Sequence, residues 1–567
     1  MESSVAQPRW LLKLPNELKL HIVDYIDERR DLYNLSRTCR VLEDKVATRL
    51  YRSIDCDFPR PGGYGKPESV PFRDLVTESV QQLTIRNGPV DIRHSVSRHR
   101  LGSSDPASVD GFVNEVLKKV PAGRLTSFAF LHQTPLSPQA LDLVFRRHET
   151  ALQHLSFYEL RTSQGNTHIP KNLISLECRT VDEGEGIEKI ITENKKTLQR
   201  LQLGQERHLM EQYQRTRADG LEQPSQPRDT FFTTALRLED LTNLRELSLF
   251  GLDVSRLRPA SIPDALFFCR LNRLTLESCP GSAEFLDSIT STFQWTLRSP
   301  DAPQTPRVAP SLEHFLFRHE NPVNAVKESV IRFLTSFTGL RTLSLLFENG
   351  AILERSSTFI AGHGPTLHTL VLESRIQPRE HLGLDTSRPF GAFGYSQELW
   401  EGSINDIARL CPNLVELGMG FPWNDELVRL RRTALPTLQH LKTIHIRNFP
   451  ENHVLSQLGD YSIKEYATKF VEWGFPALMG GSQPALEQLA IGPTLYESRW
   501  KMSPPSITTA VKRQPPQFLR SHYFCLDWAK TRFGRWSPLV TPVSEKFVEE
   551  LAGTRPLGGV FEQVWLR

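Results

Sequence analysis

A short apolar phrase, L-x-x-L-x-L, recurs along most of this chain and limits the folds open to it. Five clear copies begin at Leu244, Leu271, Leu312, Leu340 and Leu367. Thirteen windows match when other large apolar residues replace Leu, and the remaining eight begin at Val80, Leu125, Leu152, Leu173, Leu198, Leu414, Leu441 and Leu486. Seven of the twelve intervals between successive starts fall within 21–28 residues, a spacing typical of repeat proteins that stack one short strand per copy.

The alternation within each phrase predicts how one copy is built. Residues four and six of a phrase, such as Leu343 and Leu345, fall on one face of a strand. Helical apolar patterns lie between phrases, at residues 187–198, 326–337 and 404–414. We therefore predict an α/β fold in which residues 80–494 form a leucine-rich-repeat solenoid of about 13 repeats, with a curved parallel sheet and helices on its outer face. The alternative is an unrelated α/β protein whose leucine spacing arose by chance.

Several stretches depart from the repeat. Residues 204–230, 298–310 and 374–397 are polar or rich in Pro or Gly, so we expect them to be surface loops. Residues 55–79 contain a Gly-rich run and are expected to be a linker. Residues 495–567 are rich in aromatic side chains, and we expect them to cap the last repeat.

Composition excludes several classes of protein. The 567 residues carry a formal net charge of +3, which gives no reason to expect a nucleic-acid or membrane partner. No apolar run approaches the ~20 residues of a membrane span, and no secretory signal is visible. The seven cysteines include no C-x-x-C pair, so a cytoplasmic or nuclear location is expected. We expect these cysteines to be small buried hydrophobic residues and not metal ligands.

The sequence contains no motif of a familiar catalytic class. We find no phosphate-binding loop, no nucleophile elbow, no zinc-binding helix and no paired Cys/His spacing. We therefore predict no catalytic residue, no cofactor and no metal, and the chain is not expected to be an enzyme.

Residues 10–54 predict a module of three helices in front of the repeats. Pro15 suits the first turn of the first helix. This helix carries an apolar stripe at intervals of four residues, formed by Leu14, Leu18, Ile22 and Ile26. Its charged residues, Glu17, Lys19 and Asp24, are expected to face elsewhere. So small a module buries little surface, and part of its apolar face should need a partner or the adjoining solenoid.

The order of residues in this module resembles the F-box. The matching positions are Leu14, Pro15, Glu17, Leu18, Ile22, Ile26, Asp31, Leu32, Leu35, Ser36, Cys39 and Arg40. Leu42 departs from the pattern, because many F-boxes carry Trp or Phe there. An F-box followed by leucine-rich repeats implies the substrate-recognition subunit of an SCF-type (cullin-RING) E3 ubiquitin ligase. A generic three-helix cap on the solenoid is the alternative.

The resemblance also implies partners. The F-box would dock a Skp-type adaptor, which binds the cullin, and the repeats would hold a target protein for ubiquitination. Carried over by position, the adaptor-binding residues would be Leu14, Pro15, Leu18, Ile22, Leu32 and Leu35. The competing hypothesis is a leucine-rich-repeat scaffold or regulatory binding protein without a ubiquitin-ligase role.

A target-binding patch is predicted on the concave face of the solenoid, where residues three, five and seven of each phrase point. Leu316, Leu346 and Val371 fall on three successive repeats, and we expect them to be neighbours. With Phe250 and a charged rim they resemble the layout of a protein-binding surface. The candidate substrate-binding residues are Phe250, Arg273, Leu316, Arg318, Leu346, Val371 and Glu373.

Three alternatives remain open for this face. An insertion or the C-terminal segment could cover the patch within the same chain. The face could bind a small anionic ligand. Alternatively, its arginines could bind a phosphorylated or acidic degron, namely Arg86, Arg179, Arg200, Arg273, Arg318 and Arg447.

Overall fold

The computed structural model forms two compact units. Unit 1 comprises Met1–Gln212 and Arg228–Leu244, and unit 2 comprises Tyr213–Pro227 and Arg245–Arg567. The structure describes residues 13–26, 29–38, 40–58, 79–87, 106–132, 134–161, 168–181, 186–205, 240–255, 257, 266–298, 310–320, 324–348, 356–375, 397–420, 435–447, 463–475, 483–491, 522–532 and 534–544.

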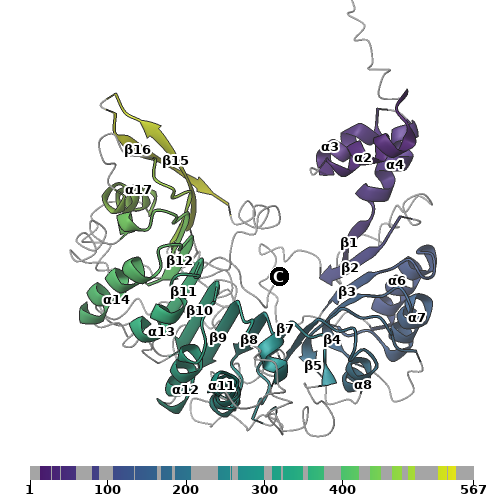
Figure 1. Ribbon diagram of the computed structural model, residues 1–567. Coiled ribbons are helices and arrows are strands. Elements are labelled where there is room, and N and C mark those ends of the chain that lie inside the picture. Colours follow the sequence, from purple (N-terminus) through teal and green to yellow (C-terminus); the bar gives the residue numbers. More distant parts are fainter. Residues whose placement is uncertain are drawn as a thin grey trace, which may run out of the picture. The chain divides into compact units, whose positions relative to one another are not determined.

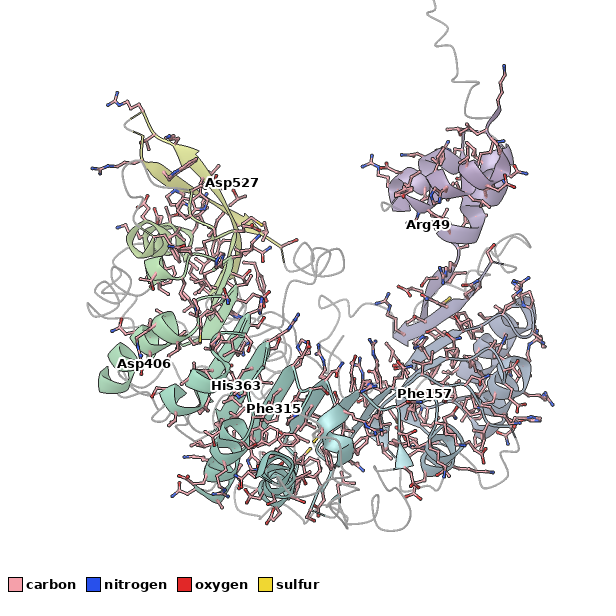
Figure 2. All side chains as sticks on the ribbon, in the orientation of Figure 1. Arg49, Phe157, Phe315, His363, Asp406 and Asp527 are labelled. Atoms are coloured by element: carbon pink, nitrogen blue, oxygen red, sulfur yellow. The ribbon has the colours of Figure 1, made fainter. Side chains whose placement is uncertain are left out.

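Three helices open unit 1, as the sequence predicts. They are α2 (Asn16–Asp24), α3 (Arg29–Ser36) and α4 (Arg40–Leu50), and α2 begins directly after Pro15. Their small core contains Val23, Leu32, Val46 and Leu50, with Ile26, Leu35 and Tyr51 packed against it. The guanidinium of Arg49, labelled in Figure 2, donates a hydrogen bond to the carbonyl of Val23 and ties α4 to the end of α2.

The rest of unit 1 is a parallel sheet whose strands pair in the order of the sequence. The strands are β1 (Ser53–Phe58), β2 (Gln82–Asn87), β3 (Ser127–Leu131), β4 (His154–Leu160), β5 (Ser175–Val181) and β6 (Arg200–Gly204). Its helices lie on one face of the sheet (Figure 1), and they are α6 (Pro106–Lys119), α7 (Pro138–His148) and α8 (Gly186–Glu193).

Unit 2 continues the same construction and ends differently. Its parallel strands are β7 (Glu246–Phe250), β8 (Arg273–Glu277), β9 (His314–Glu320), β10 (Thr342–Glu348), β11 (Thr369–Arg375), β12 (Glu416–Met419), β13 (Thr443–Ile446) and β14 (Gln488–Ile491). The antiparallel strands β15 (His522–Lys530) and β16 (Trp536–Val543) follow, with β15 paired to β14. The helices are α11 (Ser282–Arg298), α12 (Asn324–Thr335), α13 (Ser356–His363), α14 (Gln397–Leu410) and α17 (Ile463–Gly474), with 3-10 turns at Leu266–Arg270 and Leu435–Thr437.

The prediction that each phrase supplies a strand is confirmed. The thirteen phrases correspond in order to β2 through β14, and their fourth and sixth residues are buried against the helices. The predicted helices near residues 187, 326 and 404 are also present, as α8, α12 and α14. One strand was missed: β1 pairs in parallel with β2, so the expected linker begins within a strand. The predicted loops at 204–230, 298–310 and 374–397, apart from their ends, lie outside the described residues.

A repeated backbone hydrogen bond joins neighbouring copies. The carbonyl of residue two in a phrase accepts two amide hydrogens from the next phrase. For example, Gln81 accepts from Thr126 (2.8 Å) and Ser127 (3.0 Å), and Lys442 accepts from Glu487 (2.8 Å) and Gln488 (3.0 Å). Because only backbone atoms take part, this bond does not depend on the side chain at the position.

Aromatic side chains fill the space between sheet and helices. Phe315 on β9 lies 4.9 Å from Phe333 on α12, ring centre to ring centre, and Phe317 lies 5.6 Å from Phe347 on β10. Phe157 occupies the corresponding layer of unit 1 (Figure 2). Pairs at such distances add to the hydrophobic gain of burying the rings.

A buried polar residue recurs four positions before some phrases. His148, Asn194 and His363 each accept a hydrogen bond from the amide of the first leucine in the preceding phrase. The bonds run from Leu125 to His148 Nδ1 (3.4 Å), from Leu173 to Asn194 Oδ1 (2.9 Å) and from Leu340 to His363 Nδ1 (3.4 Å). These side chains satisfy a backbone group that would otherwise be buried without a partner.

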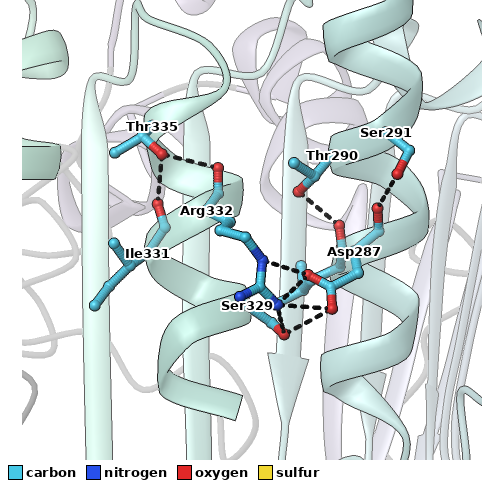
Figure 3. A network of polar contacts seen from close by, with 8 residues as sticks. Asp287, Thr290, Ser291, Ser329, Ile331, Arg332 and Thr335 are labelled. Atoms are coloured by element: carbon cyan, nitrogen blue, oxygen red, sulfur yellow. Dashed lines mark hydrogen bonds and ion pairs between the residues drawn. The ribbon is translucent and has the colours of Figure 1, made fainter. Parts of the chain in front are cut away.

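The outer helices of unit 2 are also linked by polar contacts. Asp287 on α11 accepts hydrogen bonds from the guanidinium of Arg332 on α12 (2.8 and 2.9 Å from Nη2) and from Ser329 Oγ (3.0 Å), as Figure 3 shows.

Within the described ranges, no helix combines the length and the apolar character needed to cross a bilayer.

Candidate functional site

Exposed apolar side chains are concentrated on the three N-terminal helices. Five large apolar side chains are exposed in the part of the chain that the structure describes. Four of them are Leu18 (48% exposed), Leu20 (42%), Tyr25 (77%) and Tyr33 (50%), on or directly beside α2 and α3. Exposing such side chains to water is unfavourable, and a concentration of them is typical of surfaces that bind another protein.

The apolar stripe predicted on the first helix is divided between the surface and the core of the three helices. The buried residues of α2 are Lys19 and Val23, and Ile26, the last residue of the stripe, packs against the same core. Leu18 is exposed, and Leu14 and Ile22 are half-buried. Lys19, which the pattern places off the stripe, is buried on the same side as Val23. Val23 belongs to the same apolar cluster as Val46 and Leu50 on α4 and Leu32 on α3. Leu18 and Ile22 lie about 100° around the helix from Lys19 and Val23.

The six residues carried over as adaptor contacts fall into three groups. Pro15 and Leu18 are exposed, and Leu14, Ile22 and Leu35 are half-buried. Leu32 is buried in the core of the three helices, so its side chain is not available to a partner in this structure. Ile22 lies four residues after Leu18, and Tyr25 lies three residues after Ile22, so the three side chains share one side of the helix.

We call the sheet face opposite the helices the helix-free face. On β8, β9 and β10 of unit 2, side chains on this face are partly exposed to solvent. Arg273 on β8, Leu316 on β9 and Leu346 on β10 are half-buried. Phe250 and Arg318, two of the candidate substrate-binding residues, are buried in this structure. His314 Nδ1 lies 3.0 Å from Thr342 Oγ1, and burial is the main cause that lowers the pKa of His314.

The predicted apolar row is interrupted in the register of the strands. Leu316 lies opposite Ser344 on β10, and Ser344 lies opposite Val371 on β11. Leu346 lies opposite Arg318 and Glu373, one step along the strands. Leu316 and Val371 are therefore in one cross-strand row separated by Ser344, Leu346 is diagonal to both, and the three side chains do not form a continuous apolar row.

The helix-free face at β11–β13 is closed by a side chain from the same chain. Arg447, directly after β13, reaches Glu373 at an Nη1–Oε2 distance of 2.6 Å, and both side chains are buried. The space for this crossing is provided by Gly418 on β12, where an added Cβ would lie 3.2 Å from Arg447 Nε and from Val371 Cγ2. Val371 and Glu373 are therefore not solvated, which corrects their assignment as surface residues.

Part of the C-terminal segment contributes to the same closed region. Val371, Ala490 and Tyr523 belong to one buried apolar cluster, with Val543 packed against it. Tyr523 and Val543 lie on β15 and β16, so the alternative in which the C-terminal segment helps to cover the patch applies at Val371. Gly418, at position five of the phrase that begins at Leu414, is the one sign in the sequence that a neighbouring side chain crosses the face here.

Several arginines expected on this face are already paired. Arg86 Nη2 lies 2.5 Å from Asp55 Oδ2, and Arg179 Nε lies 3.2 Å from Glu177 Oε1. Together with Arg447, three of the six arginines considered for a phosphorylated or acidic degron are therefore in ion pairs with this chain's own carboxylates. This reduces the positive charge that the face presents to a ligand.

Five of the six cysteines that the structure describes are buried, as the sequence predicts, and Cys525 is half-buried. Burial raises the pKa of Cys178, Cys279 and Cys411 to about 12 and that of Cys269 to about 11. Such thiols stay protonated and are poor nucleophiles and poor metal ligands. Among the described residues, no group of three or more His, Cys, Asp or Glu side chains is placed to hold a metal ion.

Comparison with protein families gives one match. The F-box-like family matches residues 11–57, which include the helices α2, α3 and α4. The chain therefore carries an F-box-like domain at its N-terminal end. No curated protein matches the chain.

Proposed function

We propose that this chain is the substrate-recognition subunit of an SCF-type E3 ubiquitin ligase. The F-box-like domain would dock a Skp-type adaptor of a cullin complex, and the parallel sheet would hold a target protein for ubiquitination. F-box domains typically belong to non-catalytic subunits, so the transfer of ubiquitin would be carried out by other components. We further propose that the protein acts in the cytoplasm or nucleus.

The observation that carries this proposal is the exposed apolar stripe on α2. Leu18 and Tyr25 are exposed, whereas Val23, on another side of the same helix, is part of the core of the three helices. Burying a large apolar side chain contributes about 1.5–3 kcal/mol before the costs of association. A stripe of several such side chains is therefore sufficient to drive a stable interface.

For the target-binding part we propose a leucine-rich-repeat solenoid. The proposal is supported by the thirteen phrases, the thirteen parallel strands that carry them, and the shared backbone hydrogen bond between copies. The substrate surface proposed in unit 2 comprises β8–β10, where Arg273, Leu316 and Leu346 are half-open. Phe250, Arg318, Val371 and Glu373 are buried on β7, β9 and β11, within this surface or beside it.

Co-purification with a Skp-type adaptor tests the proposal. The full chain and its Leu14→Ala/Pro15→Ala variant are each co-expressed with the adaptor, and the bound fraction is measured by size-exclusion chromatography. We expect the wild-type chain to bind and the variant to lose binding while it keeps its circular dichroism spectrum. A folded wild-type chain that binds no adaptor would contradict the proposal and favour the scaffold hypothesis.

A further inference from the structure

Unit 1 has a strongly basic edge. Four turns precede the strands β3, β4, β5 and β6, at residues 118–124, 146–150, 168–172 and 193–197, and together they form what we call the basic ridge. These residues include eight lysines and arginines and two glutamates, a net charge of +6 with His neutral. The whole chain carries only +3, so the remainder is slightly acidic and the positive charge is concentrated here.

Hydrogen bonds join the four turns into one continuous surface. The amide of Gly123 donates to the carbonyl of Arg147 (2.8 Å), and Arg147 Nη2 donates to the carbonyl of Val120 (2.9 Å). Asn172 Nδ2 donates to the carbonyl of Thr150 (3.1 Å), which links the second turn to the third. Asn194 Nδ2 donates to the carbonyl of Pro170 (2.6 Å), which links the third turn to the fourth.

The cations of the ridge are mostly exposed and are not neutralised by the acids of the ridge. Glu149 binds Lys171 at 2.9 Å, and Glu193 also acts on Lys171, whose pKa is raised by Glu149 first and by Glu193 to a lesser extent. Arg124, Arg146 and Lys196 are exposed and make no ion pair with any residue that the structure describes. The two acids therefore act mainly on Lys171, in the third turn, and Arg124, Arg146 and Lys196 stay available to a partner.

Stabilisation of helix ends explains only part of this charge. Lys118 and Lys119 lie in the last turn of α6, and Arg146 and Arg147 lie in the last turn of α7. A positive charge at the C-terminal end of a helix is stabilised by the helix dipole. Arg124, Lys171 and the Lys195–Lys196 pair lie in the turns beyond the helices. These positions gain little from the dipole, since its effect falls off within the last turn.

From this arrangement we infer that the basic ridge is a docking surface for an acidic polypeptide segment of a protein partner. The inference goes beyond the proposed function and does not depend on adaptor binding. The chemistry favours a polypeptide over the two other common polyanions. Single-stranded nucleic acid is usually bound by aromatic side chains between basic ones, and the ridge contains no Phe, Tyr or Trp. Peripheral membrane binding usually adds apolar insertion, but Val120 and Ile169, the large aliphatic side chains of the ridge, are buried.

Fluorescence anisotropy with a labelled peptide rich in Glu and Asp tests the inference. The protein is the full chain, and binding is compared at low salt and at about 0.15 M salt, where the screening length is about 8 Å. The ridge variant is Arg124→Glu/Arg146→Glu/Lys196→Glu. The control variant is Arg270→Glu/Lys464→Glu/Arg535→Glu, which reverses three exposed cations of unit 2 and has the same net charge.

We expect the wild type and the control variant to bind the acidic peptide with similar affinity. The ridge variant should bind roughly 10- to 100-fold more weakly, since three attractive charges become repulsive. Equal losses in both variants would overturn the inference, because net charge alone would then explain binding. Ridge-dependent binding of a labelled single-stranded RNA, or of vesicles with anionic lipid, tighter than that of the peptide would also overturn it. Unchanged circular dichroism spectra show that both variants are folded.

Discussion

Arg447 and Glu373 form a buried ion pair across an intervening strand, with Arg447 following β13, Glu373 on β11 and Gly418 between them on β12. The two residues are 74 positions apart in the sequence. The pair removes two charges from the helix-free face, and it fixes the spacing of three neighbouring strands.

Loss of the cation should destabilise unit 2 strongly. Arg447→Met leaves the buried carboxylate of Glu373 without this partner, and we expect a loss of about 3–5 kcal/mol in the free energy of unfolding. Adding Glu373→Gln should restore part of the loss. Arg409→Met is the matched control, because Arg409 pairs with Asp406 at an exposed site and should change stability by less than about 1 kcal/mol. Guanidinium unfolding curves measure these differences, and equal effects at the two sites would contradict the prediction.

The glycine beneath this ion pair should tolerate no branched side chain. Gly418→Val places carbon atoms against Arg447 and Val371, where even a single Cβ would be at 3.2 Å, and it should cost about 1–3 kcal/mol. Gly418→Ala should cost less, because the arginine can shift by a few tenths of an ångström. Calorimetry of the two variants tests this order, and a more stable Gly418→Val protein would disprove the packing described.

At a second glycine, Gly111, a larger side chain should stabilise the protein and not destabilise it. Gly111 lies within α6, it is exposed, and an added Cβ would meet nothing within 4 Å. Alanine is a better helix former, so Gly111→Ala should stabilise unit 1 by about 0.5–1 kcal/mol. The thermal unfolding of the variant checks this, and a destabilised variant would mean that this position is more crowded than the structure shows.

The buried histidines predict a fall in stability at mildly acidic pH. Burial lowers the pKa of His148 and of His363 to about 4, whereas the unfolded chain titrates near 6.5. Below pH 6.5 the unfolded state therefore takes up protons that the folded state cannot. The stability present above pH 6.5 is lost as the pH falls toward 4, by about 2 kcal/mol per histidine at pH 5.

A pair of asparagine variants isolates this effect. Asn194 occupies the equivalent position of another copy and accepts the same backbone hydrogen bond without titrating. The His148→Asn/His363→Asn protein should therefore lose less stability than the wild type between about pH 7.5 and pH 5. The comparison is made by unfolding at each pH, and identical pH profiles would rule out these two histidines as the cause.

The two exposed leucines of α2 should differ in adaptor binding. Leu18 lies on the apolar stripe, whereas Leu20 lies about 200° further around the helix, and both are similarly exposed. Leu18→Asp should therefore weaken the proposed adaptor complex by tenfold or more, since a hydrophobic contact of about 1.5–3 kcal/mol is lost. Leu20→Asp should have little effect. Titration calorimetry distinguishes them, and a larger loss for Leu20→Asp would place the interface on the other side of α2.

The periodic part of this fold can be predicted from the sequence, and the reasons are local. Leu247 and Leu249, or Leu343 and Leu345, define their strand by alternation alone, and every phrase shares that pattern. The strand β1 carries a weaker alternation of Ile54, Cys56 and Phe58, which does not match the phrase and was missed.

The surfaces are less predictable because they depend on distant residues. Val23 of α2 faces the core because it packs against Val46 and Leu50 of α4. The sequence of α2 alone does not show which of its sides, that of Leu18 or that of Val23, α4 will cover. Val371 satisfies every local criterion for a solvated apolar residue, yet it is buried beside Arg447, 76 positions further along. Interactions of this range leave no periodic signal in the sequence.

The bond between copies runs from backbone to backbone at the second residue of eleven of the thirteen phrases, so natural selection can change that side chain without loosening the stack. The position is occupied by Gln81, Thr126, Gln153, Ile174, Arg245, Asn272, Glu313, Arg341, His368, Val415 and Lys442, a set with no common chemistry. Charge and polarity along this edge can therefore diverge freely between related proteins, and the edge can acquire new partners while the scaffold is inherited unchanged.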